Sequence, residues 1–345
     1  MLISGSATSV SWIPSEAVTG MTKASFTTGV THYDEPPSDR AGTLAQLDAA
    51  GAEDRFRFAN RLSAWAEVSG GRIVDAGFSD DSRGVMGGTT LRFGPLSTRL
   101  AAIALPHQRE QLIGSDTRVT FRQTYGGRPA MPFPRRVSYP PYVQVSGPLV
   151  WTTLELDLHA DGRVVHRLAG ASRFPRHWVY DASGVLDQKS GVADFAEWAR
   201  TSFGEHSPWG GQDSPAFVSA VETALEREVA DVIMRGGARP AIRTLTRGET
   251  LTRQGDPAAE LYLVLDGVLS AAVDDQELGL LGPGSVLGER GLIEGRRTAT
   301  LTAETAVRVA VAPSEAVEFD ALHAISEGHR REDGLAAWDT GEVRG

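Results

Sequence analysis

The chain has 345 residues, of which 41% are hydrophobic and 23% are charged, and this leaves room for two globular domains. The formal net charge is −10, and residues 241–345 hold 10 Arg against 18 Asp and Glu, so no basic surface for nucleic acid or an anionic membrane is expected. The chain has no cysteine, which excludes disulfides, thiolate metal sites and a cysteine nucleophile.

The first residues, MLISGSATSVSWIPSEAV, have neither the basic start nor the continuous apolar run of a secretory signal. No window of about 18 apolar residues occurs, so no transmembrane helix is expected. The only lysines are Lys23 and Lys189, and this preference for arginine suggests a GC-rich bacterial source. We therefore expect a cytoplasmic bacterial protein.

The first 210 residues are rich in strand patterns. Residues 65–79 and 150–170 each predict a β-hairpin, because alternating residues flank a Gly-Gly turn in the first and an Asp-Gly turn in the second. Residues 117–127 alternate in the same way. The pattern predicts an antiparallel, β-rich N-terminal domain.

A few segments interrupt the strands. Short helices are expected near residues 41–52 and 191–201. The stretch GGRPAMPFPRRVSYPPY, residues 126–142, has too many prolines for a helix or a central strand and predicts a long exposed loop. The fold class expected for the whole chain is therefore mainly β (α+β).

The stretch GASRFPRHWVYDASG, residues 170–184, carries the most reactive side chains of the N-terminal region. In an extended strand, Arg176, Trp178 and Tyr180 share one face and His177 points to the other. Such a cluster could line a small-molecule pocket with His177 as proton donor or acceptor. The favoured interpretation is a barrel or sandwich strand with one aromatic core face and one wet face. No hydrolase, zinc-protease or P-loop motif occurs, so no catalytic residue and no metal ligand is assigned.

Residues 213–237, DSPAFVSAVETALEREVADVIMRGG, predict a helix. Its start carries capping residues and a proline suited to a first turn, its apolar residues recur every three or four positions, and two glycines can end it. We predict a domain of unknown role at residues 1–237 that this helix closes, a second domain at residues 238–330, and an acidic tail at residues 331–345.

Short strands separated by glycine turns follow this helix. Residues 260–273, ELYLVLDGVLSAAV, predict a strand pair around an Asp-Gly turn. Residues 288–305, GERGLIEGRRTATLTAET, then place a glutamate and two arginines around one glycine-bearing loop. A glycine turn leading into a short helix presents N–H groups to an anion, and an arginine can pair with a phosphate. A glutamate can accept hydrogen bonds from sugar hydroxyls, so the loop fits the ribose and phosphate of a nucleotide.

Four motifs in this order give the C-terminal third its resemblance to the cyclic nucleotide-binding domain family. They are RQGD with Gly255, YLVLDG with Gly267, GPGSVLGE with Gly284, and the glycine-bearing loop, over roughly residues 242–325. The family includes the modules of the catabolite activator protein and of kinase regulatory subunits. The resemblance implies a double-stranded β-helix jelly roll with flanking helices.

The resemblance also implies the site residues. In that family a glutamate holds the ribose 2′-hydroxyl and an arginine pairs with the cyclic phosphate, and these positions fall on Glu289 and Arg297. The loop is one residue shorter than the commonest pattern, and this leaves Arg296 open as an alternative. Arg290 also stands where an apolar residue is usual. The implied binding residues are Gly288, Glu289, Gly291, Leu292, Arg297, Thr298 and Ala299.

The resemblance implies a cyclic mononucleotide ligand, cAMP in preference to cGMP, and no metal. The leading hypothesis is a non-enzymatic sensor protein that couples ligand occupancy to the N-terminal β-rich domain. Two alternatives stay open: an enzyme whose N-terminal pocket is regulated by the C-terminal domain, and an assembly protein that uses a ligand-free jelly roll for packing. No room for a helix-turn-helix follows the jelly roll and no kinase motif occurs, so neither nucleic acid nor a membrane is expected as a partner. A homo-oligomer or a protein partner would use the N-terminal domain.

Overall fold

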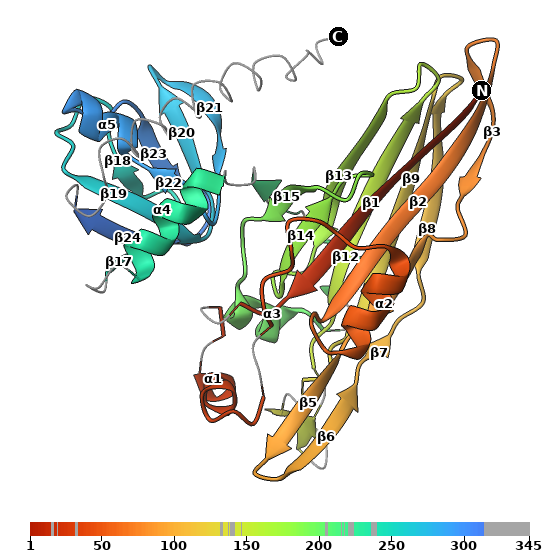
Figure 1. Cartoon of the computed structure of the whole chain (residues 1–345), viewed down its shortest axis with the longest axis horizontal. Helices are drawn as coiled ribbons and strands as arrows, with labels where there is room; N and C mark the ends of the chain where they lie inside the picture. The colour runs from red at the N-terminus through yellow and green to blue at the C-terminus, as the bar shows by residue number, and fades with distance from the viewer. Residues whose placement is uncertain are drawn as a thin grey trace. The chain divides into compact units, whose positions relative to one another are not determined.

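The computed structural model describes two compact units, Met1–Ala216 and Phe217–Gly345 (Figure 1). It describes residues 1–313 apart from residues 15–16, 19, 32–33, 132–133, 137, 139–141, 146, 204–205, 215, 217, 220–223 and 236–239. The predicted acidic tail, residues 331–345, lies outside the described residues. Within them no helix is long and apolar enough to cross a membrane.

Two antiparallel sheets form the first unit (Figure 1). One sheet runs in the order β15-β14-β1-β2-β3, with β4 also pairing with β2, and the other runs β13-β12-β9-β7, with β8 also pairing with β9. The strands are β1 (Leu2–Trp12), β2 (Phe58–Ser69), β3 (Arg72–Phe78), β4 (Arg83–Met86), β7 (Ile103–Ala104), β8 (Gln108–Ser115), β9 (Arg118–Arg128), β12 (Val150–His159), β13 (Val164–Ala171), β14 (Arg176–Tyr180) and β15 (Leu186–Ser190). The predicted fold class, mainly β with antiparallel sheets, is confirmed.

The two sheets pack face to face through β1 and β12. A Cβ on Gly5 would lie 2.6 Å from Val164 and 3.2 Å from Leu158, so the sheets approach too closely there for a side chain. Polar groups within this layer pair with one another: the Ser9 and Thr152 hydroxyls lie 2.7 Å apart and both are buried. The strand alternation therefore gives each sheet one buried inner face.

Both predicted hairpins of the first unit are confirmed. The β2–β3 turn uses Gly70 and Gly71 at φ 58° and 75°, and the β12–β13 turn uses Gly162 at φ 95°. These left-handed values explain why glycine occupies the turns. Two further hairpins pair β5 (Gly88–Phe93) with β6 (Leu96–Ala101) and β10 (Pro134–Arg136) with β11 (Val143–Val145).

The predicted loop at residues 126–142 is therefore wrong in part, because β9 extends to Arg128 and β10 lies inside it. Its strand β10 is only three residues long and begins with Pro134. A proline is tolerated at the first residue of a short edge strand, where its missing N–H costs no ladder hydrogen bond. The composition correctly excluded a long central strand but not this short one.

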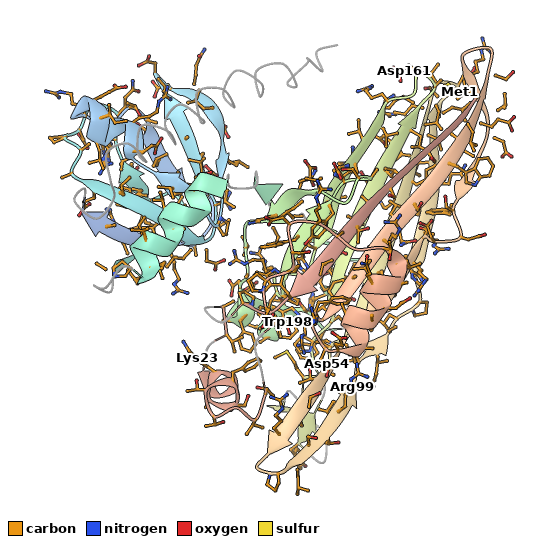
Figure 2. The ribbon with its side chains drawn as sticks, in the orientation of Figure 1. Met1, Lys23, Asp54, Arg99, Asp161 and Trp198 are labelled. Atoms are coloured by element: carbon orange, nitrogen blue, oxygen red, sulfur yellow. The ribbon has the colours of Figure 1, made fainter. Side chains whose placement is uncertain are left out.

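The helices of the first unit are short. They are α1 (Gly20–Thr27), α2 (Leu44–Ala52), α3 (Phe195–Thr201) and the 3₁₀ turn η2 (Pro208–Gly210). Thr43 caps α2 in a reciprocal capping box with Gln46, and Asp194 caps α3. Trp198 of α3 donates its indole N–H to the Leu149 carbonyl at 2.7 Å and packs on Phe174 and Phe195. This helix closes one end of the sandwich, away from Met1 and Asp161 (Figure 2).

The second unit is a jelly roll of two four-stranded antiparallel sheets, in the orders β17-β24-β19-β22 and β18-β23-β20-β21. Its elements are β16 (Val218–Ser219), α4 (Ala224–Arg235), β17 (Ala241–Leu245), β18 (Thr250–Thr252), β19 (Glu260–Asp266), β20 (Leu269–Val273), β21 (Gln276–Leu281), β22 (Val286–Leu287), α5 (Glu289–Glu294), β23 (Thr300–Ala303) and β24 (Val307–Pro313). Buried aliphatic residues from both sheets, with Tyr262, fill the core between them.

The predicted strand pair at residues 260–273 is wrong in its pairing. Both strands and the Asp-Gly turn exist, but β19 pairs with β24 and β20 pairs with β21 and β23, so the two strands lie in opposite sheets. Gly267, at φ 87°, turns the chain from one sheet to the other, and the Ala306 carbonyl occupies the space that its side chain would need. The tight hairpin is the next turn along the chain, between β20 and β21, at Asp274 and Asp275, which both have positive φ.

The predicted helix at residues 213–237 is wrong in its start, because α4 begins only at Ala224 and β16 occupies Val218–Ser219. Asp213 does not cap it; its carboxylate accepts hydrogen bonds from Trp151 and Thr153.

The helix that forms packs on the second unit. Val229 and Ile233, one turn apart, share a buried cluster with Leu261, Leu263 and other strand residues of the jelly roll. The Glu226 carboxylate accepts a hydrogen bond from the Val286 N–H at 3.2 Å. The sequence had placed this helix at the end of the first domain, whereas the compact units divide at 216/217, before it. Periodicity shows a buried face but not which neighbour covers it.

Candidate functional site

The predicted binding loop lies between β22 and β23. Gly288 ends β22 with φ 92°, the six residues of α5 follow, and Gly295 ends that helix with φ 76°. Two features of position 288 require glycine. Besides the left-handed backbone, a Cβ there would lie 2.5 Å from Nη1 of Arg297.

The backbone around the two arginines is held by the RQGD segment. The Arg297 N–H donates to the Asp256 carbonyl at 2.7 Å, and the Gly255 N–H donates to the Arg297 carbonyl at 2.8 Å. Arg296 donates through Nη1 to the Gly255 carbonyl at 2.9 Å. Two motifs that are about forty residues apart in sequence are therefore hydrogen-bonded neighbours, and the β19 motif YLVLDG supplies the third side of the site.

The two arginines differ in environment. Arg296 is exposed, while Arg297 is only 6% exposed. The Arg297 guanidinium donates from Nη1 to the Glu260 carbonyl at 2.9 Å and from Nη2 to the Tyr262 hydroxyl at 3.1 Å. Its Cζ lies 5.0 Å from the centroid of the Tyr262 ring, within cation–π range. Of the two candidates, Arg297 is thus the one that the fold directs inward.

Glu289 is the first residue of α5 and is only 5% exposed. Nη1 of Arg297 occupies the space that a Cβ on Gly288, the residue directly before Glu289, would need. The predicted carboxylate and the predicted guanidinium therefore start from adjacent, buried points of the loop. This juxtaposition suits a ligand that offers hydroxyls and an anionic group side by side.

The other predicted residues pack around these two. Gly291 is tightly enclosed, because a Cβ there would lie 3.1 Å from the Arg296 carbonyl and 3.2 Å from Ala258. Leu292 is partly buried against the cluster that contains α4 and β19. Thr298 and Ala299 are half-buried, and the Ala299 carbonyl accepts a hydrogen bond from Thr252 at 3.3 Å.

Sequence reasoning missed Tyr262 and Glu260. Both lie on β19, and the Tyr262 hydroxyl donates to Oε2 of Glu260 at 2.9 Å while it accepts from Arg297. The tyrosine belongs to the quoted YLVLDG motif, but an aromatic residue in a strand ordinarily indicates core. Only the pairing of the sheets shows that its hydroxyl reaches the loop.

A cavity of about 380 Å³ lies elsewhere on the jelly roll, between β17 and β18. Residues 243–256 supply its lining, including Arg243, Arg253 and Asp256. None of the seven predicted binding residues contributes to it. The cavity still borders the loop, because the carbonyl of its lining residue Asp256 accepts from the Arg297 N–H at 2.7 Å.

In the first unit, His177 is an enclosed core residue. Its Nδ1 lies 2.7 Å from the Ser11 hydroxyl and its Nε2 lies 2.8 Å from the Ser172 carbonyl, so the protein uses both ring nitrogens. The side chain is fully buried, and burial lowers its pKa to about 4. The ring is therefore neutral at pH 7 and enclosed by protein, which disfavours a role in proton transfer.

The other face of that strand is the predicted aromatic core face, but the wet face expected opposite it is wrong, because His177 and Val179 are fully buried there. Arg176, Trp178 and Tyr180 are all buried. Trp178 meets Trp12 edge to face at 5.6 Å, and the Lys189 ammonium lies 4.3 Å from the Trp178 ring centroid. Cation–π and aromatic contacts of this kind stabilise a sheet without a ligand.

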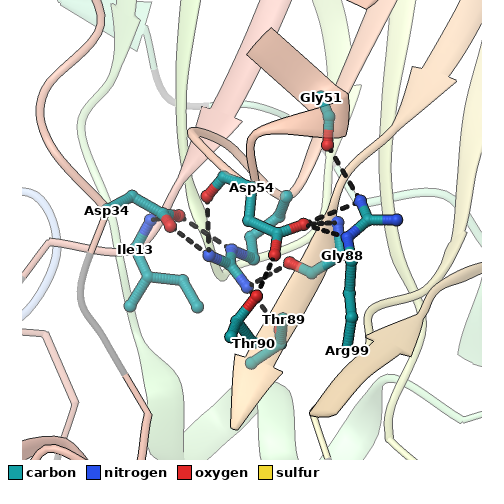
Figure 3. Close-up of polar contacts among 9 residues, drawn as sticks. Ile13, Asp34, Gly51, Asp54, Gly88, Thr89, Thr90 and Arg99 are labelled. Atoms are coloured by element: carbon teal, nitrogen blue, oxygen red, sulfur yellow. Dashed lines mark hydrogen bonds and ion pairs between the residues drawn. The ribbon is translucent and has the colours of Figure 1, made fainter. Parts of the chain in front are cut away.

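A buried network of ion pairs and hydrogen bonds lies next to the first residue of β2 (Figure 3). Arg57 pairs with both oxygens of Asp34, whose carboxylate also accepts from the Ile13 N–H at 2.8 Å. Asp54 accepts from Arg99, from Thr90 and from the Gly88 N–H. Burial alone would raise the pKa of Asp54, but these hydrogen bonds and the two arginines lower it. The network ties the β5–β6 hairpin to the sandwich, which is a structural role.

Among the residues that the structure describes, no group of three or more His, Asp or Glu could hold a metal ion. The expectation that no metal is needed remains a prediction.

Residues 242–319 match the family model of the cyclic nucleotide-binding domain. A cGMP-dependent protein kinase of Plasmodium berghei (strain Anka) is 38% identical over 64 residues, which is 18% of this chain and 8% of the kinase. Among solved structures, an EAL enzyme in its cGMP-bound form is 24% identical, with a TM-score of 0.22, and covers 25% of this chain and 23% of its own. PKAR CBD2 with bound Sp-2Cl-cAMPS is 18% identical, with a TM-score of 0.27, and covers 34% of this chain and 90% of its own.

The kinase and the EAL enzyme are much longer than the regions that match, so the activities of those whole proteins are not assigned to this chain. The family match spans β17 to the end of the described jelly roll, and it includes the RQGD, YLVLDG and GPGSVLGE motifs and the loop. The C-terminal third of the chain is therefore a cyclic nucleotide-binding domain.

Proposed function

We propose that the protein is a sensor whose C-terminal domain binds a cyclic mononucleotide, with cAMP preferred to cGMP, and whose N-terminal β-rich unit responds to occupancy. In this proposal Glu289 accepts hydrogen bonds from the ribose and Arg297 pairs with the cyclic phosphate. Gly288, Gly291, Leu292, Thr298 and Ala299 form the rest of the loop. The protein works in the cytoplasm, and a homo-oligomer or a protein partner uses the first unit.

One observation carries the proposal: the burial of Arg297 against Gly288, directly before Glu289. A surface ion pair would leave such side chains exposed and would contribute little. A buried guanidinium costs free energy unless acceptors meet it, and here the described acceptors are neutral. A phosphate would supply the missing negative charge.

The segment α4 is suited to transmit occupancy. Through Val229 and Ile233 it shares a buried cluster with β19, β22 and Leu292 of the loop helix, and Glu226 is hydrogen-bonded to β22 directly before Gly288. A ligand that moves α5 must repack this cluster. In sequence, α4 is also the first helix after the boundary between the two units, so a shift of α4 is the simplest route for the signal.

Isothermal titration calorimetry of the full-length protein with cAMP and cGMP tests the proposal. The wild type should bind at least one of them. Arg297→Ala should weaken binding by a factor of about 30 or more, because loss of a buried charged partner costs roughly 2–5 kcal/mol. Arg296→Ala is the matched control and should stay within about threefold, since that side chain is exposed. A wild type that binds neither nucleotide would instead support the assembly role.

A further inference from the structure

Three residues around the loop form a directed hydrogen-bond chain. Glu260 and Tyr262 are two residues apart on β19 and therefore share one face of the strand. The Tyr262 hydroxyl donates to Oε2 of Glu260 at 2.9 Å, and this leaves its oxygen to accept from Nη2 of Arg297 at 3.1 Å. The backbone carbonyl of Glu260 accepts from Nη1 at 2.9 Å. Burial raises the pKa of Tyr262, so the hydroxyl keeps the proton that this direction requires.

These contacts hold the guanidinium at two of its three nitrogens. A guanidinium has five N–H donors in one plane, and the hydrogen bonds above use one on each terminal nitrogen. The Nε–H and two terminal N–H groups have no partner among the described residues. The Tyr262 ring beneath Cζ, 5.0 Å away, fixes the plane as well. The Nε–Nη2 edge, which suits two oxygens of a phosphate, keeps a free N–H at each end.

We propose that Tyr262 is a positioning residue for the cyclic phosphate: with Glu260 it sets the plane of Arg297 before the ligand arrives. This proposal rests on the proposed function. An arginine side chain loses rotamer freedom when it is ordered by a ligand, and a guanidinium ordered beforehand avoids that cost at binding. Tyr262 contributes this order without touching the nucleotide.

The central experiment is Tyr262→Phe in the full-length protein. The change deletes the hydroxyl and keeps the ring under the guanidinium. We expect binding of the preferred cyclic nucleotide to weaken about tenfold, equivalent to about 1.4 kcal/mol. Glu260→Gln keeps an acceptor for the tyrosine hydroxyl and should stay within about threefold of the wild type. Glu260→Leu removes that acceptor and should behave like Tyr262→Phe.

Two readouts separate positioning from a general loosening of the fold. The Sp and Rp phosphorothioate analogues each replace one exocyclic oxygen of the phosphate with sulfur, a weaker acceptor. A guanidinium held in one plane distinguishes them, so the ratio of their affinities should move several-fold toward one in Tyr262→Phe. A loosened fold would weaken both analogues equally. In an Arg297→Lys background, Tyr262→Phe should add less than a twofold loss.

The outcomes are distinct. If the wild type binds a cyclic nucleotide and Tyr262→Phe binds it equally well with an unchanged Sp-to-Rp ratio, the role of Tyr262 is wrong while the proposed function stands. If the wild type binds none, the proposed function falls and this inference falls with it. If Tyr262→Phe unfolds in part, the calorimetric stoichiometry gives the folded fraction. The affinity ratio in that fraction still decides the question.

Discussion

Replacing Gly288 with alanine tests the closeness of the loop to Arg297. The residue has φ 92°, which costs a non-glycine residue about 1–3 kcal/mol. In addition, the new Cβ would lie 2.5 Å from Nη1 of Arg297 and 3.1 Å from the Glu260 carbonyl, whereas ordinary contact begins near 3.4 Å. The guanidinium must therefore retreat by about 1 Å. Moved directly away from the new Cβ, Nη1 would lie about 3.3 Å from the Glu260 carbonyl instead of 2.9 Å, so that hydrogen bond is weakened and the guanidinium is turned from its position.

Gly295→Ala is a matched control, because Gly295 ends the same helix at φ 76° and has no atom within 4 Å of its virtual Cβ. Both variants should lower the melting temperature of the jelly roll by about 4 °C per kcal/mol of backbone strain, measured by scanning calorimetry. Only Gly288→Ala should also weaken cyclic-nucleotide binding, by a factor of ten or more in titration calorimetry. Equal losses of affinity in the two variants, or none in either, would show that Arg297 is not held where the structure places it.

Three other predictions concern the first unit and the partners. Arg57→Ala should destabilise that unit by about 3–5 kcal/mol in urea unfolding, because it removes the guanidinium that pairs with both oxygens of the buried Asp34 carboxylate; an effect below 1 kcal/mol would refute the role of the network. His177 has its pKa lowered to about 4 in the folded state from an ordinary 6.5. The unfolded chain therefore binds the proton first, and stability should be complete above pH 6.5 and fall by roughly 3 kcal/mol as the pH drops to 4. Tryptophan fluorescence can follow the unfolding of the first unit, since six of the seven tryptophans lie in it. His177→Gln should flatten the dependence of stability on pH, whereas His206→Gln, at an exposed position, should not. Finally, the protein should give no sequence-specific gel shift with DNA, and a salt-resistant shift would contradict this.

Local patterns predicted the elements of this fold better than their partners. The hairpins at Gly70-Gly71 and Gly162 were predictable, because positive φ and adjacent strands are encoded within a few residues. The turn at Gly267 carries the same Asp-Gly signal, yet it joins strands of opposite sheets. The deciding factor is the approach of the Ala306 carbonyl, a contact between residues almost forty positions apart.

The place of the proposed binding loop in the fold was predictable for the same reason. Gly288, Glu289 and Arg297 lie within ten residues, and their spacing carries the resemblance to the family. The choice between Arg296 and Arg297 could not be decided from spacing alone, because a loop shorter by one residue than the usual pattern fits the family in two registers. The fold distinguishes the two arginines. The backbone of Arg297 is hydrogen-bonded to Gly255 and Asp256, and its side chain is buried.

The acceptors that hold the buried arginine come from β19, not from the loop that carries it. Glu260 and Tyr262 lie 37 and 35 positions before Arg297, and the pairing of β19 with β22 and β24 brings them to it. In the proposed site, affinity for an anionic ligand therefore depends on two separate segments, one that supplies the guanidinium and one that orients it. A substitution in β19 can change affinity while every residue of the loop stays the same. The proposal consequently predicts that a binding loop with all its expected residues is not sufficient for tight binding, because the strand behind it must also present an acceptor at the position of the Tyr262 hydroxyl.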